Sequence, residues 1–135
     1  MEVKIESKIG TIQGSHDKVY AFLSDFTNIQ KLIPPDKVKN FEATPDECSF
    51  EADKIGRGGF RIINREPNKT IKIEWTGQQQ KDFFFWIQLI EPMPYKTKIK
   101  LTIKAEMNMM MKMMAEKPLK NFLDTLVEQV SKIPF

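Results

Sequence analysis

Residues 38–107 carry the pattern that most constrains the fold: short alternating apolar and polar stretches, separated by turn residues at regular intervals. The last stretch is the clearest, because Ile99, Leu101 and Ile103 share one face while polar residues occupy the other. A two-residue period is typical of strands with one buried face. No segment here is long enough for a helical crossover, so we expect antiparallel pairing. The expected strands cover residues 38–43, 47–54, 58–66, 69–77, 81–91 and 95–107.

The two ends of the chain supply the remaining elements. Residues 3–13 alternate in the same way and predict one more strand. Two short amphipathic helices come next, the first capped by Ser15 and the second ended by Pro34. Apolar residues spaced by three and four predict a long helix over residues 119–133, with Pro118 in its first turn. Residues 109–117 are either a separate helical turn or a kinked extension of that helix.

These elements together predict an α+β fold in which a seven-stranded curved antiparallel sheet wraps a long C-terminal helix. The order is one strand, two helices, six strands and a final helix. Strongly twisted sheets of this size curl, and only the final helix has an apolar face wide enough to cover the concave side. A chain of 135 residues with 41% hydrophobic content is expected to form one domain, residues 1–135.

Composition argues against several classes of function. The net charge of +3 comes from lysines interleaved with carboxylates, which argues against nucleic acid as a partner. No apolar run approaches the roughly 18 residues of a membrane span, and the first residues do not resemble a signal peptide, so a cytoplasmic location is predicted. Cys48 is the only cysteine and is expected to be a buried apolar residue. We predict no metal, cofactor or disulfide.

The order of the elements resembles the START-related superfamily, which includes the birch-pollen allergen family, the polyketide cyclase/dehydrase group and lipid-transfer domains. The resemblance runs from Val3 to Ile133 and is most specific in residues 19–34 and 55–67. It implies a helix-grip fold with a cavity between the sheet and the long helix. Such a cavity takes up an apolar or amphipathic small molecule of the lipid, polyketide or aromatic type.

Three glycines within residues 55–67, Gly56, Gly58 and Gly59, invite comparison with a phosphate-binding loop. A strand comes after them instead of a helix N-terminus, so the geometry that binds phosphate is not expected. The sequence favours a tight turn or a bulge between two strands.

The predicted cavity lining consists of residues whose faces agree in parity with the concave side of the sheet. These residues are Phe60, Ile62, Ile73, Trp75, Phe85, Met110, Met114, Phe122 and Leu126. Two of them belong to a methionine cluster that spans residues 107–114. Unbranched thioether side chains adapt to irregular shapes, so this cluster has three interpretations: pocket lining, core filling or a partner surface.

The run Phe83 to Ile87 is apolar on both faces of its strand, because consecutive side chains point to opposite sides. One face can serve the cavity. The other predicts a homodimer contact or cover by a loop.

The leading hypothesis is a binding or transport module for a hydrophobic small molecule. An enzyme resembling the cyclase/dehydrase group is the alternative, and it would need an acid or base in the cavity: Glu74, Tyr20 and Asp82 are the candidates. No catalytic motif is present, and His16, the only histidine, is expected on an exposed helical turn. A third hypothesis is an interaction module resembling activators of a heat-shock chaperone ATPase, although their tryptophan-bearing segment near the final helix is missing.

Overall fold

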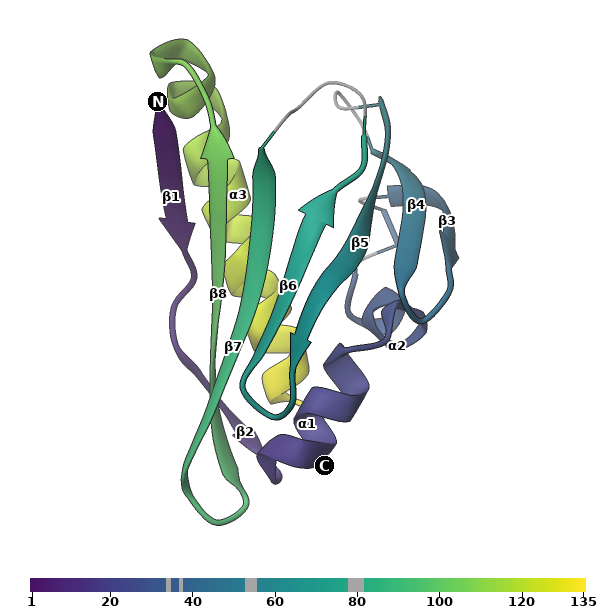
Figure 1. Cartoon of the computed structure of the whole chain (residues 1–135), viewed down its shortest axis with the longest axis vertical. Coiled ribbons are helices and arrows are strands. Elements are labelled where there is room, and N and C mark those ends of the chain that lie inside the picture. Colours follow the sequence, from purple (N-terminus) through teal and green to yellow (C-terminus); the bar gives the residue numbers. More distant parts are fainter. Residues whose placement is uncertain (34, 37, 53–55, 78–81) are drawn as a thin grey trace.

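The computed structural model describes residues 1–33, 35–36, 38–52, 56–77 and 82–135. Within them, the strands form one curved antiparallel sheet with the order β1-β8-β7-β6-β5-β4-β3, and β2 also pairs with β8 (Figure 1). The strands are β1 (Glu2–Glu6), β2 (Gly10–Gln13), β3 (Val38–Ala43), β4 (Glu47–Ala52), β5 (Gly56–Glu66), β6 (Thr70–Trp75), β7 (Phe83–Met93) and β8 (Lys96–Glu106). The helices are α1 (His16–Leu23), α2 (Phe26–Ile29), the 3-10 helix η1 (Gln30–Leu32) and α3 (Met109–Ser131). The predicted α+β fold with antiparallel pairing and a long C-terminal helix is confirmed.

The first predicted strand is interrupted, which raises the number of described strands from the expected seven to eight. Between the paired residues Glu6 and Gly10 the chain advances four positions, whereas β8 advances three, from Thr102 to Ile99. Ser7 lies at the break, where its Oγ accepts a hydrogen bond from the Leu101 N–H at 2.9 Å. The extra residue reverses the parity of β2 relative to β1. From Gly10 onward, each residue of β2 therefore lies on the face opposite to the one that a single uninterrupted strand would give it.

The N-terminus of α1 is satisfied differently from the sequence prediction. Ser15 occupies the N-cap position, but its side chain makes no capping hydrogen bond. Instead, the carboxylate of Glu91 on β7 accepts a hydrogen bond from the His16 N–H at 2.6 Å. The contact joins residues far apart in the sequence, so local capping rules alone could not identify it. It fixes the start of α1 against the sheet.

Helix α3 begins earlier than predicted and includes the methionine segment. Asn108 caps it by accepting a hydrogen bond from the Met111 N–H at 2.8 Å. Pro118 therefore lies inside the helix, and its predicted place in the first turn is wrong. The residues before it are mostly good helix formers, which carry the helix past a proline that lacks an N–H. Within the described part of the chain, every helix is too short or too polar to cross a lipid bilayer.

Helix α3 packs along β1, β2 and β8. Figure 1 shows α3 starting beside the N-terminus and crossing behind the sheet toward α1. Leu123 and Val127 on α3 are fully buried, as are Ile12 and Ile99 on the strands. Gly10 permits this close approach, because a Cβ at that position would lie 2.4 Å from Val127 Cγ1. The other half of the sheet, β3 to β6, lies beyond this contact zone.

Candidate ligand-binding site

Six aromatic side chains on the concave face of β3 to β7 form a continuous group, which we call the aromatic cluster. Neighbouring ring centroids in it are 5.2 to 6.4 Å apart. Strand register produces the cluster, because Phe60 pairs with Trp75 while Ile73 pairs with Phe85, so alternate residues share one face. The members are Phe41, Phe50, Phe60, Trp75, Phe83 and Phe85.

Glycines let the indole of Trp75 lie close against the backbone. A Cβ at Gly58 would lie 2.0 Å from Trp75 Cη2, and one at Gly77 would lie 2.4 Å from Cε2. Only glycine at both positions leaves room for the ring in its present place. Gly56 has a positive φ of 84° at the start of β5, whereas Gly58 and Gly59 lie within the strand. Gly59 also serves close packing, because a Cβ there would lie 2.3 Å from the Cys48 carbonyl oxygen. Gly56 begins β5 at the turn expected over residues 55–57, of which residue 55 lies outside the described chain.

The rings of the aromatic cluster differ in burial. Phe50 and Phe85 are buried, whereas Phe41, Phe60, Trp75 and Phe83 are only partly buried. Trp75 Nε1 is itself buried and, within the described structure, has no hydrogen-bond acceptor. Most buried polar groups in proteins have a partner, so this donor is unusual. The cluster therefore combines accessible apolar rings with one unpaired polar group.

The structure places the predicted lining residues in two environments. Phe60, Ile62, Ile73, Trp75 and Phe85 lie together on the concave face, as the alternation indicated. On α3, Leu126 is buried and Phe122 is partly buried against the core. That these residues contact a ligand remains a prediction.

Met110 and Met114 lie apart from this group, with 72% and 73% of their surface exposed. Nearly consecutive methionines surround the start of α3, and only one face of a helix can meet the sheet. Met107, which precedes the helix, is buried in the core. Core filling therefore describes Met107, whereas Met110 and Met114 would have to meet a ligand or a partner from outside the packed core.

The predicted lining lacks Phe41, Phe50 and Phe83, which belong to the aromatic cluster. Phe50 was detectable, because it shares a strand face with Cys48 and lies opposite Gly58 in the register. Phe83 was also detectable from its parity with Phe85. Phe41 was not, because the register between β3 and β4 shifts between Lys39 and Glu42.

The outer face of β7 carries Phe84 and Trp86, whose ring centroids are 6.0 Å apart. Lys72 Nζ lies 4.7 Å from the centroid of Phe84, and Lys104 Nζ lies 5.5 Å from that of Trp86. Lysine side chains thus flank rings that were predicted to meet a second copy or a loop. A hollow of about 440 Å³ adjoins these residues and includes the carboxylates of Glu2 and Asp82 in its wall.

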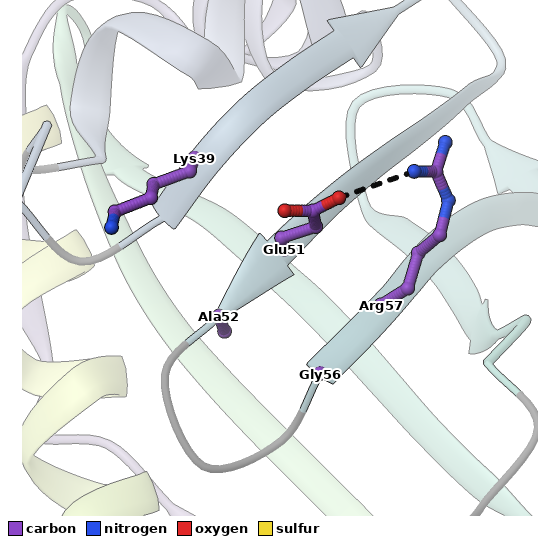
Figure 2. Close-up of a pocket in the computed structure, with 5 residues that line it drawn as sticks. All are labelled: Lys39, Glu51, Ala52, Gly56 and Arg57. Atoms are coloured by element: carbon purple, nitrogen blue, oxygen red, sulfur yellow. Dashed lines mark hydrogen bonds and ion pairs between the residues drawn. The ribbon is translucent and has the colours of Figure 1, made fainter.

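A second hollow, of about 310 Å³, opens at the ends of β3, β4 and β5. Figure 2 shows the Glu51 carboxylate turned toward Arg57, at 3.3 Å, while Lys39 extends away from both. Ala52 and Gly56 complete the wall. Both hollows have charged walls, and neither includes a residue of the predicted cavity lining.

Three side chains were named as candidate acids or bases. Glu74 pairs with Arg61 on the outer face, and Asp82 is exposed in the outer hollow. Tyr20 is partly buried. Burial raises the pKa of its phenol more than the nearby Arg65 lowers it, so the pKa lies above its ordinary value. Tyr20 is thus the one named candidate that packs against the core.

Cys48 is buried, as predicted, and burial raises the pKa of its thiol to about 11. A protonated, buried thiol is a poor nucleophile. Among the described residues, no group of three His, Cys, Asp or Glu side chains is arranged to hold a metal ion. The aromatic cluster itself offers ring faces and edges and one indole N–H for contact with a ligand.

No protein-family description and no curated protein matches the chain. Solved structures do. A truncated norcoclaurine synthase from Thalictrum flavum is 12% identical, with a TM-score of 0.77, and the match covers 98% of this chain and 92% of that one. A START superfamily protein from Mycobacterium smegmatis is 14% identical, with a TM-score of 0.65 and 96% of each chain covered. The Aha1 dimer from Colwellia psychrerythraea is 18% identical, with a TM-score of 0.66, and the match covers 96% of this chain and 97% of that one.

These identities are low, so the likeness establishes the fold and nothing finer. The α+β helix-grip fold that the sequence indicated is confirmed.

Proposed function

We propose that this protein binds an apolar or amphipathic small molecule against the aromatic cluster, on the concave side of the sheet. The observation that carries the proposal is the partial burial of Phe41, Phe60, Trp75 and Phe83 on a face that normally forms a core. Covering roughly 200 Å² of such apolar surface contributes about 5 kcal/mol before the cost of association. A ligand that completes this core is thus favoured by the same force that folds the chain.

The packing of α3 supports the same location. Helix α3 packs against β1, β2 and β8, which lie at the opposite edge of the sheet from β3 to β5. Phe122 and Leu126 point from α3 toward the common core, and we propose that they form the opposite wall. Ligand uptake would move rings of the aromatic cluster, because the two hollows lie elsewhere.

Native mass spectrometry tests the proposal. The purified protein is measured as isolated and again after incubation with oleate, cholesterol and 2-acetylnaphthalene. We expect one ligand per chain from at least one class, and a loss of that adduct in Phe60→Ser. The control Ile90→Ser changes an exposed apolar residue and should retain the adduct. Absence of adducts from every class, at concentrations up to about 100 times a micromolar Kd, would contradict the proposal.

The cyclase/dehydrase-like enzyme remains the second candidate, and Tyr20 is the residue that favours it. Burial raises the pKa of the Tyr20 phenol, so the group stays protonated and can donate a hydrogen bond to a carbonyl oxygen, although it is a weaker acid than an exposed phenol. If this function is correct, Tyr20→Phe abolishes turnover of an aromatic polyketide model compound while ligand binding persists. Turnover that is unchanged in Tyr20→Phe would remove Tyr20 from the proposal.

The predicted homodimer would use the outer face of β7, where Phe84 and Trp86 lie. Support comes from these surface rings, and the similar Aha1 from Colwellia is described as a dimer. Sedimentation equilibrium of the wild type and of Trp86→Ser tests this prediction, because the variant should dissociate if the face is an interface. An interaction role like that of chaperone ATPase activators, and the cytoplasmic location, rest on the sequence alone.

A further inference from the structure

The aromatic cluster contains more information about the ligand than its apolar character. Its members meet mainly edge to face or tilted: Phe60 and Trp75 have an interplanar angle of 71° at 5.2 Å, and Phe50 and Trp75 one of 65° at 6.0 Å. Aromatic rings in these arrangements attract one another beyond simple burial, because the positive edge of one ring meets the negative face of the next. A planar ring inserted among them would keep this type of contact. A flexible alkyl chain would replace it with weaker, nonspecific contact.

The floor of the cluster is also suited to a flat ligand. Because Gly58 and Gly77 have no side chains, the Trp75 indole lies close against the backbone instead of standing away from it. An indole in this position can present a broad face to whatever lies above it. Phe60 and Phe83 lie next to the indole and to each other: their centroids are 5.2 and 6.1 Å from that of Trp75 and 6.4 Å apart.

The unpaired Trp75 N–H adds a polar requirement. A buried donor that lacks an acceptor destabilises a protein, because it has lost its hydrogen bond to water without gaining another. Within the described residues, no acceptor meets Trp75 Nε1. The other members of the aromatic cluster are phenylalanines, whose side chains have no polar atom to offer. An acceptor on the ligand would relieve this cost and would fix the orientation of the ligand in an otherwise apolar site.

We propose that the ligand is a planar aromatic molecule carrying a hydrogen-bond acceptor, such as a ring-attached carbonyl oxygen, which binds the N–H of Trp75. This inference rests on the proposed function and narrows its ligand class. It favours aromatic ketones and related planar acceptors over fatty acids.

Three matched compounds test the inference by titration calorimetry. 2-Acetylnaphthalene carries the ring and the acceptor, 2-isopropenylnaphthalene has nearly the same shape without the oxygen, and decanoate is an aliphatic chain. We expect the ketone to bind about fivefold more tightly than the alkene, which corresponds to one hydrogen bond of about 1 kcal/mol. Decanoate should bind most weakly of the three.

Two variants isolate the N–H. Trp75→Phe keeps an aromatic ring but removes the donor, so it should equalise the affinities of the ketone and the alkene. Trp86→Phe makes the same change on the outer face and should preserve the preference. Circular dichroism and a urea midpoint establish that both variants fold.

The outcomes separate the two proposals. Equal affinities of the two naphthalenes for the wild type would overturn the role of the Trp75 N–H. Tighter binding of decanoate than of either naphthalene would overturn the aromatic class while leaving the small-molecule function intact. If no compound binds here, and native mass spectrometry also finds no adduct, both proposals fail.

Discussion

The two halves of the concave face are built from the same kind of strand but are packed differently. Where α3 meets β1, β2 and β8, residues such as Ile12, Leu123 and Val127 are fully buried. Across β3 to β7, the aromatic cluster leaves four large rings partly exposed. We call these regions the packed half and the aromatic half. The packed half buries its side chains more completely, and the aromatic half is where we propose that a ligand binds.

The largest effect is expected from a cavity made in the packed half. Leu123→Ala removes most of a fully buried side chain and should lower the free energy of unfolding by about 3 kcal/mol. Leu119→Ala makes the same chemical change at a partly buried position of the same helix, and should cost about half as much. Urea denaturation measures both. Equal losses would mean that α3 is not packed more tightly at Leu123 than at Leu119.

A smaller effect is expected from adding one methyl group to the aromatic half. Gly58→Ala places a Cβ in the space of the Trp75 indole and should lower the free energy of unfolding by about 2 kcal/mol. In a Trp75→Leu background the same substitution should cost less than about 1 kcal/mol, because the clashing ring is gone. A double-mutant cycle by urea denaturation measures this coupling. Additive losses would show that Gly58 is required for some reason other than the indole.

The third effect concerns an electrostatic contact at the edge of the packed half. Asp124 on α3 accepts a hydrogen bond from the Lys8 N–H at 2.7 Å, at the break between β1 and β2. Burial tends to raise the pKa of Asp124, but this bond and the Lys120 ammonium outweigh it and lower the pKa. Asp124→Ala should therefore lower the free energy of unfolding at pH 7 by about 1–2 kcal/mol.

The pH dependence of that loss is set by the direction of the shift. A carboxylate with a lowered folded pKa contributes its stability above the unfolded value, near 3.8 for aspartate, and loses it as pH falls through the folded pKa. The wild type and Asp124→Ala should thus differ at pH 7 and converge well below pH 3.8. Lys120→Met removes only an exposed partner and should change stability by less than about 0.5 kcal/mol. A difference that persists in acid would contradict the role of the charged carboxylate.

The smallest effect is expected at the exposed start of α3. Replacing Met110, Met113 and Met114 by Gln should change the free energy of unfolding by no more than about 0.5 kcal/mol at each site, since all three are more than 70% exposed. We expect ligand affinity to change less than about twofold. Calorimetry with 2-acetylnaphthalene measures this. A larger loss of affinity would place Met110 and Met114 in the binding site, as the sequence predicted.

Local pattern accounts for the features that the sequence predicted correctly. Alternation within each strand assigned Phe60, Ile73, Trp75 and Phe85 to the concave face, and the register confirms this shared face. Helical spacing likewise identified the buried face of α3, including Leu126. These signals are local because side-chain direction depends on only a few neighbouring residues.

Contacts between distant residues, and in one case two competing local signals, account for the features that the sequence missed. The extra residue between β1 and β2 is detectable only against its partner strand β8. Gly58 is explained by the ring of Trp75, which lies on another strand. Helix α3 starts at Met109 because Asn108 caps it, a signal that was present but was outweighed by Pro118. Each of these depends on tertiary packing or on competition between two local preferences.

The indole N–H resonances of the two tryptophans provide the most direct test of the central claim that the aromatic half binds the ligand. A ¹H–¹⁵N correlation spectrum, assigned with Trp86→Phe, separates Trp75 in the aromatic half from Trp86 on the outer face. On titration with 2-acetylnaphthalene, the Trp75 signal should move downfield while the Trp86 signal stays in place. Movement of the Trp86 signal alone, or of neither signal at saturating ligand, would contradict the account.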